Sequence, residues 1–190
     1  MMPLSAPQED REPVYCRRIE YRGFRREGIL WDIEGRLRDV RTADFPCVDR
    51  GGFIRAGEPF HEMLLRLTVD DDLIIHGIEA VVEYAPFKIC PCTQALFGTL
   101  VGMKIESGFF GEVRKRLPPL KTCRHLIDLL MGTAAAAFQT VAQVRYFQYM
   151  RGVKPEMIDS CMAWDSAGEV VRREWPRYYA GKDGDAHGQT

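Results

Sequence analysis

The sequence predicts an α+β fold, in which an antiparallel sheet made from N-terminal and central hairpins packs against three helices and a C-terminal hairpin closes the chain. Three observations support this prediction. Apolar residues alternate at period two in the first half of the chain, helical patterns follow Pro86, and two short apolar segments flank a turn near the end. Strands followed by helices favour α+β over an alternating α/β arrangement.

The size and charge of the chain limit its class. Its 190 residues, 46% hydrophobic and 28% charged, suit one ordinary domain, which we place at 13–178 between flexible termini at 1–12 and 181–190. Its 26 basic and 27 acidic residues are interspersed and give a net charge of −1. This balance argues against nucleic-acid binding and against a polybasic membrane surface.

The N-terminal residues have neither the basic start nor the apolar run of a signal peptide. The most apolar stretch, 126–144, contains one aspartate and two glutamines, which argues against a membrane span. The sequence therefore predicts a cytoplasmic protein.

The first predicted hairpin spans Cys16 to Val40. One face of its second strand is apolar (Ile29, Trp31, Ile33, Leu37) and the other is charged (Asp32, Glu34, Arg36, Arg38). A turn at 26–28 joins the two strands. The segment 42–59 is rich in glycine and proline, and we expect a long connecting loop there.

The central hairpin follows this loop. A strand is expected at His61 to Val69, a turn at 70–72, and one or two strands at 73–84 with a break at Gly77. Three helices then follow, at 91–101 with Cys90 as its N-cap, at 108–117, and from 122 or 123 to about 150.

The chain is expected to close with a hairpin, whose strands run over 158–164 and 169–175 around a turn at 165–168. Aromatic residues at this end are expected to be exposed, and a homodimer contact is one use for them (Trp175, Tyr178, Tyr179).

Six cysteines in a cytoplasmic chain indicate buried thiols, metal ligands or reactive thiols more often than disulfides. Their spacing contains no C-x-x-C pair, so an autonomous zinc finger is not expected. Cys161, in a predicted strand, is most simply a core residue.

Cys90 and Cys123 stand out because each is expected at a helix N-terminus. Unpaired backbone N–H groups and the helix dipole there favour the thiolate, which binds metals and attacks electrophiles. Cys92 lies next to the first cysteine, and His125 lies next to the second. The alternative is that both cysteines are small buried apolar residues.

His61 is expected at the start of a strand, directly after the glycine- and proline-rich loop. A histidine in this position can face a site at the sheet edge and offer a neutral nitrogen ligand. It can equally be a satisfied structural histidine.

Along nearly its whole length, the chain resembles a bacterial family of uncharacterised proteins, domain-of-unknown-function family 2889. The segments that carry the resemblance are 30–34, 56–63, 89–91, 100–102, 123–126, 137–140 and 159–176. The resemblance implies no activity. It does imply that five residues belong to the family pattern (His61, Cys90, Cys123, His125, Cys161), whereas Cys16, Cys47 and Cys92 are particular to this chain.

From Gly57 to Phe138 the order of strands, cysteines and helices is also similar to that of NifU-type iron–sulfur scaffold proteins. Those proteins hold zinc or a cluster through three cysteines and an aspartate. The resemblance implies a site of His61, Cys90 and Cys123, with His125, Cys92, Cys161 or water in a fourth position. The first scaffold cysteine is absent, since Pro59 stands in its place.

Three classes of function follow from these residues. The first is a metal-binding protein that holds zinc or iron, which becomes a metal-assisted enzyme on a small metabolite if water completes the site. The second is a metal-free cysteine-dependent enzyme, with Cys123 or Cys90 as nucleophile and His125 or His61 as base. The third is an accessory module without chemistry, in which the cysteines are core residues.

Overall fold

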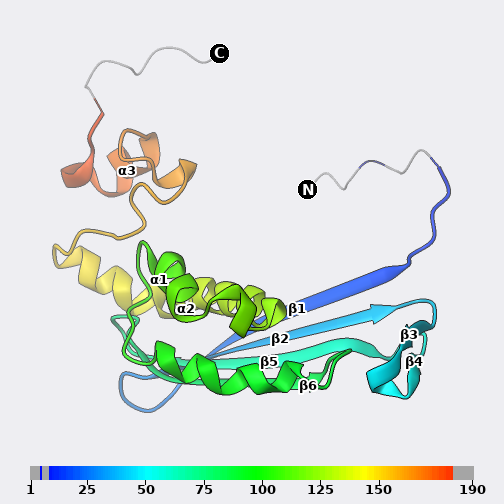
Figure 1. The fold of residues 1–190 in the computed structure, drawn as a ribbon. Coiled ribbons are helices and arrows are strands. Elements are labelled where there is room, and N and C mark those ends of the chain that lie inside the picture. The colour runs from blue at the N-terminus through cyan, green and yellow to red at the C-terminus, as the bar shows by residue number, and fades with distance from the viewer. Residues whose placement is uncertain (1–4, 6–8, 182–190) are drawn as a thin grey trace. The chain divides into compact units, whose positions relative to one another are not determined.

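A computed structural model describes residue 5 and residues 9–181, and the predicted flexible termini fall largely outside this range. The chain divides into two compact units, residues 1–142 and 143–190, with the division inside one long helix (Figure 1). Each unit is described by itself, and one domain over 13–178 stays a prediction. The mixed architecture confirms the α+β class.

The N-terminal unit is built on an antiparallel sheet of order β1-β2-β5-β6. Its strands are β1 (Tyr15–Arg25), β2 (Trp31–Arg41), β5 (Pro59–Val69) and β6 (Ile75–Tyr84). Both predicted hairpins are confirmed. The predicted break at Gly77 is wrong, because β6 runs through it with an irregular register at its start.

The two central strands give the sheet one apolar face. Ile33 pairs with Leu67 and Leu37 with Met63, and all four side chains are completely buried. The alternate residues carry charges, as where Arg66 binds Glu34 and Glu79 on neighbouring strands. The period-two pattern thus decides which face receives the helices.

The predicted loop at 42–59 contains structure of its own. It holds β3 (Phe45–Cys47), a 3-10 turn η1 (Val48–Arg50) and β4 (Gly52–Ile54), and the two strands pair antiparallel. Gly51 closes the turn with φ 79°, a conformation that glycine adopts without strain. This small ribbon stands at the end of the main sheet (Figure 1).

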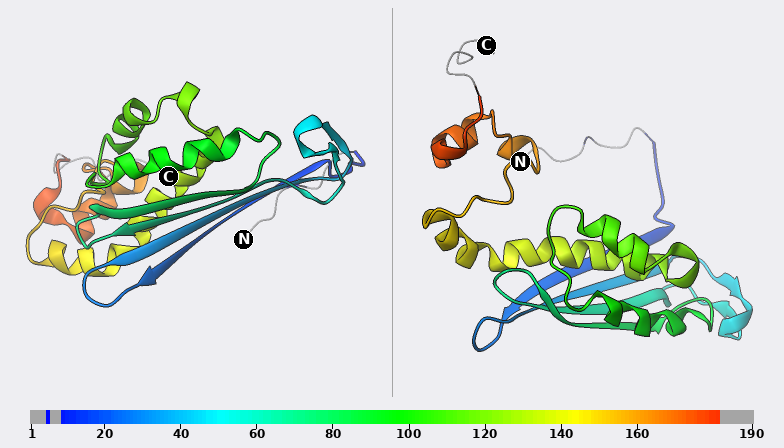
Figure 2. Two further views of the ribbon diagram at one scale, coloured as in Figure 1. Left: turned by 60° about the horizontal axis from the view of Figure 1, so that its bottom comes forward. Right: turned by 60° about the vertical axis from the view of Figure 1, so that its left-hand side comes forward.

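Three predicted helices are present. They are η2 (Cys90–Leu100), α1 (Phe109–Arg116) and α2 (Arg124–Met150), with a short η3 (Pro119–Lys121) before α2 (Figure 2). The first is a 3-10 helix, and Ile89, not Cys90, precedes it as N-cap.

Helix α2 packs closely on the sheet because glycines leave room for it. A Cβ built on Gly35 of β2 would lie 2.5 Å from Oγ1 of Thr133 and 3.0 Å from Leu129. A Cβ on Gly23 of β1 would lie 2.5 Å from Cγ2 of Thr140. These contacts fix the helix over β1 and β2, which in turn fixes where its first turn lies.

Length and composition would also allow α2 to cross a membrane, although a third of its most apolar window, 33%, is buried in the fold. The core helix of a globular unit has the same properties. The absence of a membrane partner therefore stays a prediction.

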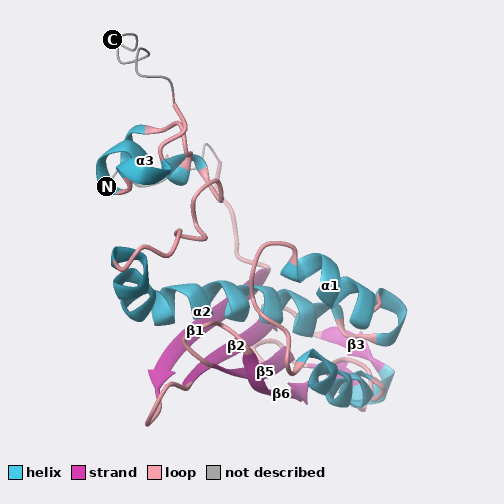
Figure 3. Ribbon diagram, turned by 90° about the vertical axis from the view of Figure 1, so that its left-hand side faces the viewer, coloured by secondary structure: helices cyan, strands magenta, loops and turns pink. Residues whose placement is uncertain are grey.

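The C-terminal unit corrects three predictions. In place of a closing hairpin it has η4 (Met162–Trp164), α3 (Glu169–Glu174) and η5 (Pro176–Tyr178) (Figure 3). Trp175 is buried against Tyr149, Ile158 and Val171, so it is not an exposed aromatic. Cys161 is exposed and outside any strand. Apolar residues at helical spacing (Val171, Trp175) explain the error, because short segments fit either period.

We predict that Gly35→Ala lowers the free energy of unfolding by about 1–3 kcal/mol, because the new methyl group overpacks the contact with Thr133. Denaturant unfolding measures the loss. The matched control is Gly77→Ala, where a Cβ would meet Thr68 at an ordinary 3.5 Å. Equal stabilities of the two variants would show that α2 does not rest on this glycine.

Candidate metal centre

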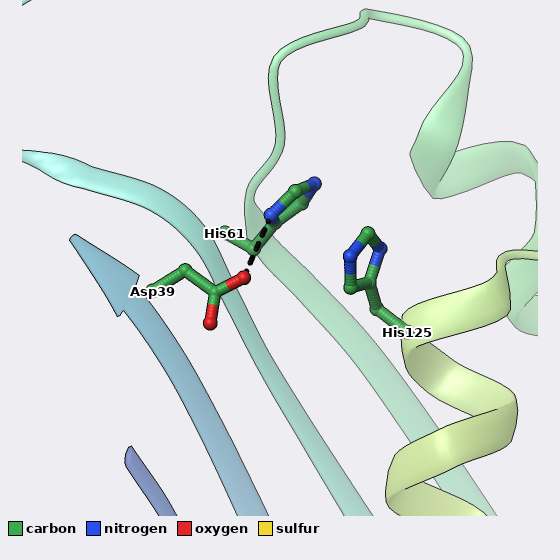
Figure 4. A group of neighbouring side chains, drawn as sticks. All are labelled: Asp39, His61 and His125. Carbon is green, nitrogen blue, oxygen red and sulfur yellow. Dashed lines mark hydrogen bonds and ion pairs between the residues drawn. The ribbon is translucent and has the colours of Figure 1, made fainter. Parts of the chain in front are cut away.

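Three polar side chains meet at one end of the sheet (Figure 4). Asp39 lies near the end of β2, His61 near the start of β5, and His125 in the first turn of α2. Their potential ligand atoms all lie within 4.8 Å of one another. The group has the composition of a metal site.

Strand register brings the first two together. Asp39 and His61 are direct partners in the β2–β5 ladder, and the register shifts immediately after Asp39. Direct partners point to the same face, here the face covered by helices. The close packing of α2 then places His125 over this pair.

Asp39 is held by a two-point ion pair. Arg17, on β1, donates from Nε to Oδ1 and from Nη2 to Oδ2, both at 2.7 Å. The carboxylate is almost fully buried, with 2% of the side chain exposed, and it also lies 3.1 Å from Nδ1 of His61. Burial alone would raise the pKa of Asp39, but hydrogen bonds from Arg17 and Tyr15 and the Arg17 charge outweigh it and lower the pKa. Asp39 is therefore a carboxylate near neutral pH.

The two histidines face each other. Their ring centroids are 3.8 Å apart, with the planes 33° from parallel. Burial, followed by the charge of His125, lowers the pKa of His61 to about 4, although Asp39 opposes the shift. Burial and then the charge of Arg17 lower the pKa of His125. Both imidazoles are therefore neutral near pH 7, the form that binds metals.

The contact with Asp39 also selects a tautomer of His61. A carboxylate accepts a proton donor, so Nδ1 of His61 carries the hydrogen in this pair. Nε2 is then left with its lone pair. Carboxylates orient metal-binding histidines in the same way.

The cysteines are placed differently from our predictions. Cys123 lies beside the histidines, with Sγ 4.0 Å from Nδ1 of His125 and 4.0 Å from Sδ of Met63. Within the described part of the chain, the convergent group contains His61 and His125 but neither Cys90 nor Cys123.

The expectation that Cys90 favours the thiolate is wrong. Burial raises the pKa of Cys90, and the neighbouring Cys123 raises it further, because two thiolates repel each other. Of the other suggested fourth ligands, Cys92 is exposed and Cys161 belongs to the C-terminal unit.

Asp39 was not among the residues that we singled out, although the sequence contains a signal for it. The apolar face that includes Ile33 and Leu37 continues, at the same period of two, to Asp39. A carboxylate at the next inward position of an apolar strand face must find a partner or a function.

Comparison with known proteins places this site in a family. Residues 15–139 match the model of a family described as a protein of unknown function, DUF2889. The chain belongs to this family. The residues of the convergent group and its neighbours, from Tyr15 to His125, lie within the matched segment of this DUF2889 protein. No curated protein and no solved structure matches the chain.

The low pKa of His61 predicts that stability depends on pH. Between the ordinary pKa of 6.5 and the folded value of about 4, the unfolded chain binds a proton that the folded chain does not. The free energy of unfolding should therefore fall by about 1.4 kcal/mol per pH unit as the pH drops through this window. Denaturant unfolding of metal-free protein at several pH values measures the slope.

His61→Gln should reduce the pH dependence of the free energy of unfolding by about one proton. In NMR spectra of the parent protein, the His61 ring resonances should keep their neutral positions at about pH 5.5. Identical slopes for the variant and the parent would contradict a buried neutral His61.

Proposed function

We propose that this protein binds one zinc or iron(II) ion through His61 and His125 and uses it in a reaction on a small metabolite. The observation that carries the proposal is the pair of imidazole rings whose centroids lie 3.8 Å apart, beside the buried carboxylate of Asp39. Imidazole suits both metals.

The most favourable role for Asp39 is to orient His61. Both of its oxygens already accept from Arg17, and Oδ2 also contacts Nδ1 of His61. A carboxylate bound in this way has few lone pairs left for a metal. In this arrangement Asp39 makes His61 a better ligand without contacting the ion.

The small number of protein ligands supports an enzymatic use of the ion. A structural zinc site has four protein ligands, whereas catalytic sites keep a position for water or substrate. Two imidazoles converge here, and the Cys123 thiol is the nearest additional donor to His125 among the contacts described. A bound ion would acidify water or polarise a carbonyl group at the open positions.

The resemblance to NifU-type scaffolds supports this proposal only in part. Of the three residues that it implies, His61 lies in the convergent group, whereas Cys90 and Cys123 do not. We therefore propose a mononuclear site and not the assembly of an iron–sulfur cluster.

A second candidate is metal-free cysteine chemistry, favoured by the distance of 4.0 Å between Sγ of Cys123 and Nδ1 of His125. In this alternative His125 would take the thiol proton, and Cys123 would attack an electrophilic substrate. Rapid and selective labelling of Cys123 by iodoacetamide, unchanged by chelators, would favour it over the metal site.

Our other sequence-based expectations stay predictions: a bacterial protein, a cytoplasmic location, no nucleic-acid or membrane partner, and a homodimer contact. The accessory module without chemistry is the outcome that remains if neither metal binding nor selective thiol labelling is found.

We predict that protein purified without oxygen or a metal-binding tag contains about one equivalent of zinc or iron. His61→Gln and His125→Gln should each abolish stoichiometric binding, because each removes one of two imidazoles. Asp39→Asn should weaken affinity by roughly 10- to 100-fold, the usual effect of losing an orienting carboxylate. Elemental analysis and competition with a chromogenic chelator measure these effects.

Cys161→Ala is the matched control, since this exposed cysteine lies in the other unit and should not change metal content. Cys90→Ala should also keep the metal, in contrast to the ligand set implied by the scaffold resemblance. Full metal content in His125→Gln would refute the proposed site.

A further inference from the structure

Next to the candidate metal centre, the guanidinium group of Arg41 stands among three aromatic rings. Its Cζ atom lies 4.9 Å from the centre of the Phe45 ring, 5.0 Å from Phe60 and 5.9 Å from Tyr15. The rings come from different strands, and two of them pack edge to face, with the Phe45 and Phe60 centroids 5.1 Å apart. Three aromatic side chains thus surround the guanidinium group, and we refer to Tyr15, Phe45 and Phe60 as its aromatic setting.

The guanidinium group has no anionic partner among the described residues. Its Nε is buried and has no hydrogen-bond acceptor there. A buried N–H group without an acceptor costs about 1–3 kcal/mol, and such groups in folded proteins require an explanation. Aromatic faces attract the charge of an arginine but do not accept its N–H groups as a carboxylate does.

Arg17, two residues along the neighbouring strand, provides the contrast. Both arginines lie on the same face, because Tyr15 pairs with Arg41 and Arg17 pairs with Asp39 in the β1–β2 ladder. Arg17 is neutralised by Asp39 through two hydrogen bonds. The same arrangement of strands thus contains one arginine with a carboxylate and one without.

Two of the three rings connect Arg41 to the metal centre. The Phe60 ring packs against His61, with centroids 5.0 Å apart. Tyr15 lies beside Asp39, and burial together with the Asp39 carboxylate raises the pKa of Tyr15. Phe45 and Tyr15 are 40% and 43% exposed, so the setting is open to solvent on one side.

We propose that Arg41 is the subsite for the carboxylate group of a small organic acid that binds beside the metal ion. The planar fork of a guanidinium group matches a carboxylate through two hydrogen bonds. The aromatic walls suit the apolar part of such a molecule. The inference rests on the proposed function and names the substrate class of the same site.

The balance of charge supports an anion. Arg17 and Asp39 neutralise each other, whereas the guanidinium group of Arg41 has only aromatic rings against it among the described residues and keeps its positive charge. A monoanionic carboxylate is favoured over a phosphate dianion, because Arg41 is the one cation among these three rings in the described structure and a single guanidinium group matches a single carboxylate.

Protein loaded with cobalt(II) is titrated with benzoate and acetate, and with benzamide and acetamide as neutral analogues, by calorimetry and by the visible cobalt spectrum. Parent protein should bind benzoate saturably and benzamide at least about tenfold more weakly. Arg41→Met should weaken benzoate binding by about tenfold or more with unchanged cobalt stoichiometry, and Arg41→Lys should weaken it less.

Arg50→Met is the matched control, since Arg50 also lies over an aromatic ring, 5.3 Å from the centre of Tyr84, and this variant should bind benzoate normally. Thermal unfolding shows whether each variant is folded. Equal benzoate affinity in Arg41→Met and parent protein, or no saturable carboxylate binding by the loaded parent, would overturn the inference. Tighter binding of inorganic phosphate than of benzoate would also overturn it.

Failure of the metal centre can be distinguished from failure of the carboxylate subsite. A parent protein that binds no cobalt refutes the metal centre, and the same titrations on metal-free protein then test Arg41 alone. Benzoate binding that is lost in Arg41→Met supports the carboxylate subsite, and its absence from the parent refutes the subsite as well.

Discussion

The buried carboxylate of Asp39 is the constraint on which the rest of this site depends. An ionised group with 2% of its side chain exposed needs compensating donors, and Arg17 supplies two of them from the neighbouring strand. Breaking a fully buried pair of this kind costs roughly 3–5 kcal/mol. The cost here is lower, because 30% of the Arg17 side chain is exposed. The ion pair fixes the end of β2, and through it the orientation of His61.

Close packing of α2 provides the second half of the site. Glycines at 23 and 35 remove the side chains that would keep the helix away from β1 and β2. The first turn of α2 then brings His125 to stacking distance from His61. The imidazoles become buried and neutral as a consequence of this packing, so the electrostatics of the site follow from backbone geometry on the apolar face of the sheet.

Much of the fold was predictable because the two hairpins and the long helix have long, regular hydrophobic patterns. The C-terminal segment was not, because segments of six or seven residues fit either period. For the site, His61 and His125 could be named from sequence, but their partner could not, since strand register pairs Asp39 with His61 across 22 positions. The expectation of a Cys90 thiolate was wrong because a position at a helix start does not reveal burial or the nearby Cys123, both of which raise the pKa of Cys90.

The position of Arg41 follows from the same strand geometry and indicates how the site is organised. On one face of β1 and β2, the ladder places Tyr15 opposite Arg41 and Arg17 opposite Asp39. Arg17 holds the carboxylate of Asp39, whereas Arg41 lies among aromatic rings on the side open to solvent. If Arg41 had a purely structural role, an acceptor within the protein would bind its N–H groups, as Asp39 does for Arg17. The absence of such an acceptor for Arg41 among the described residues is more simply explained by a partner that arrives from solution.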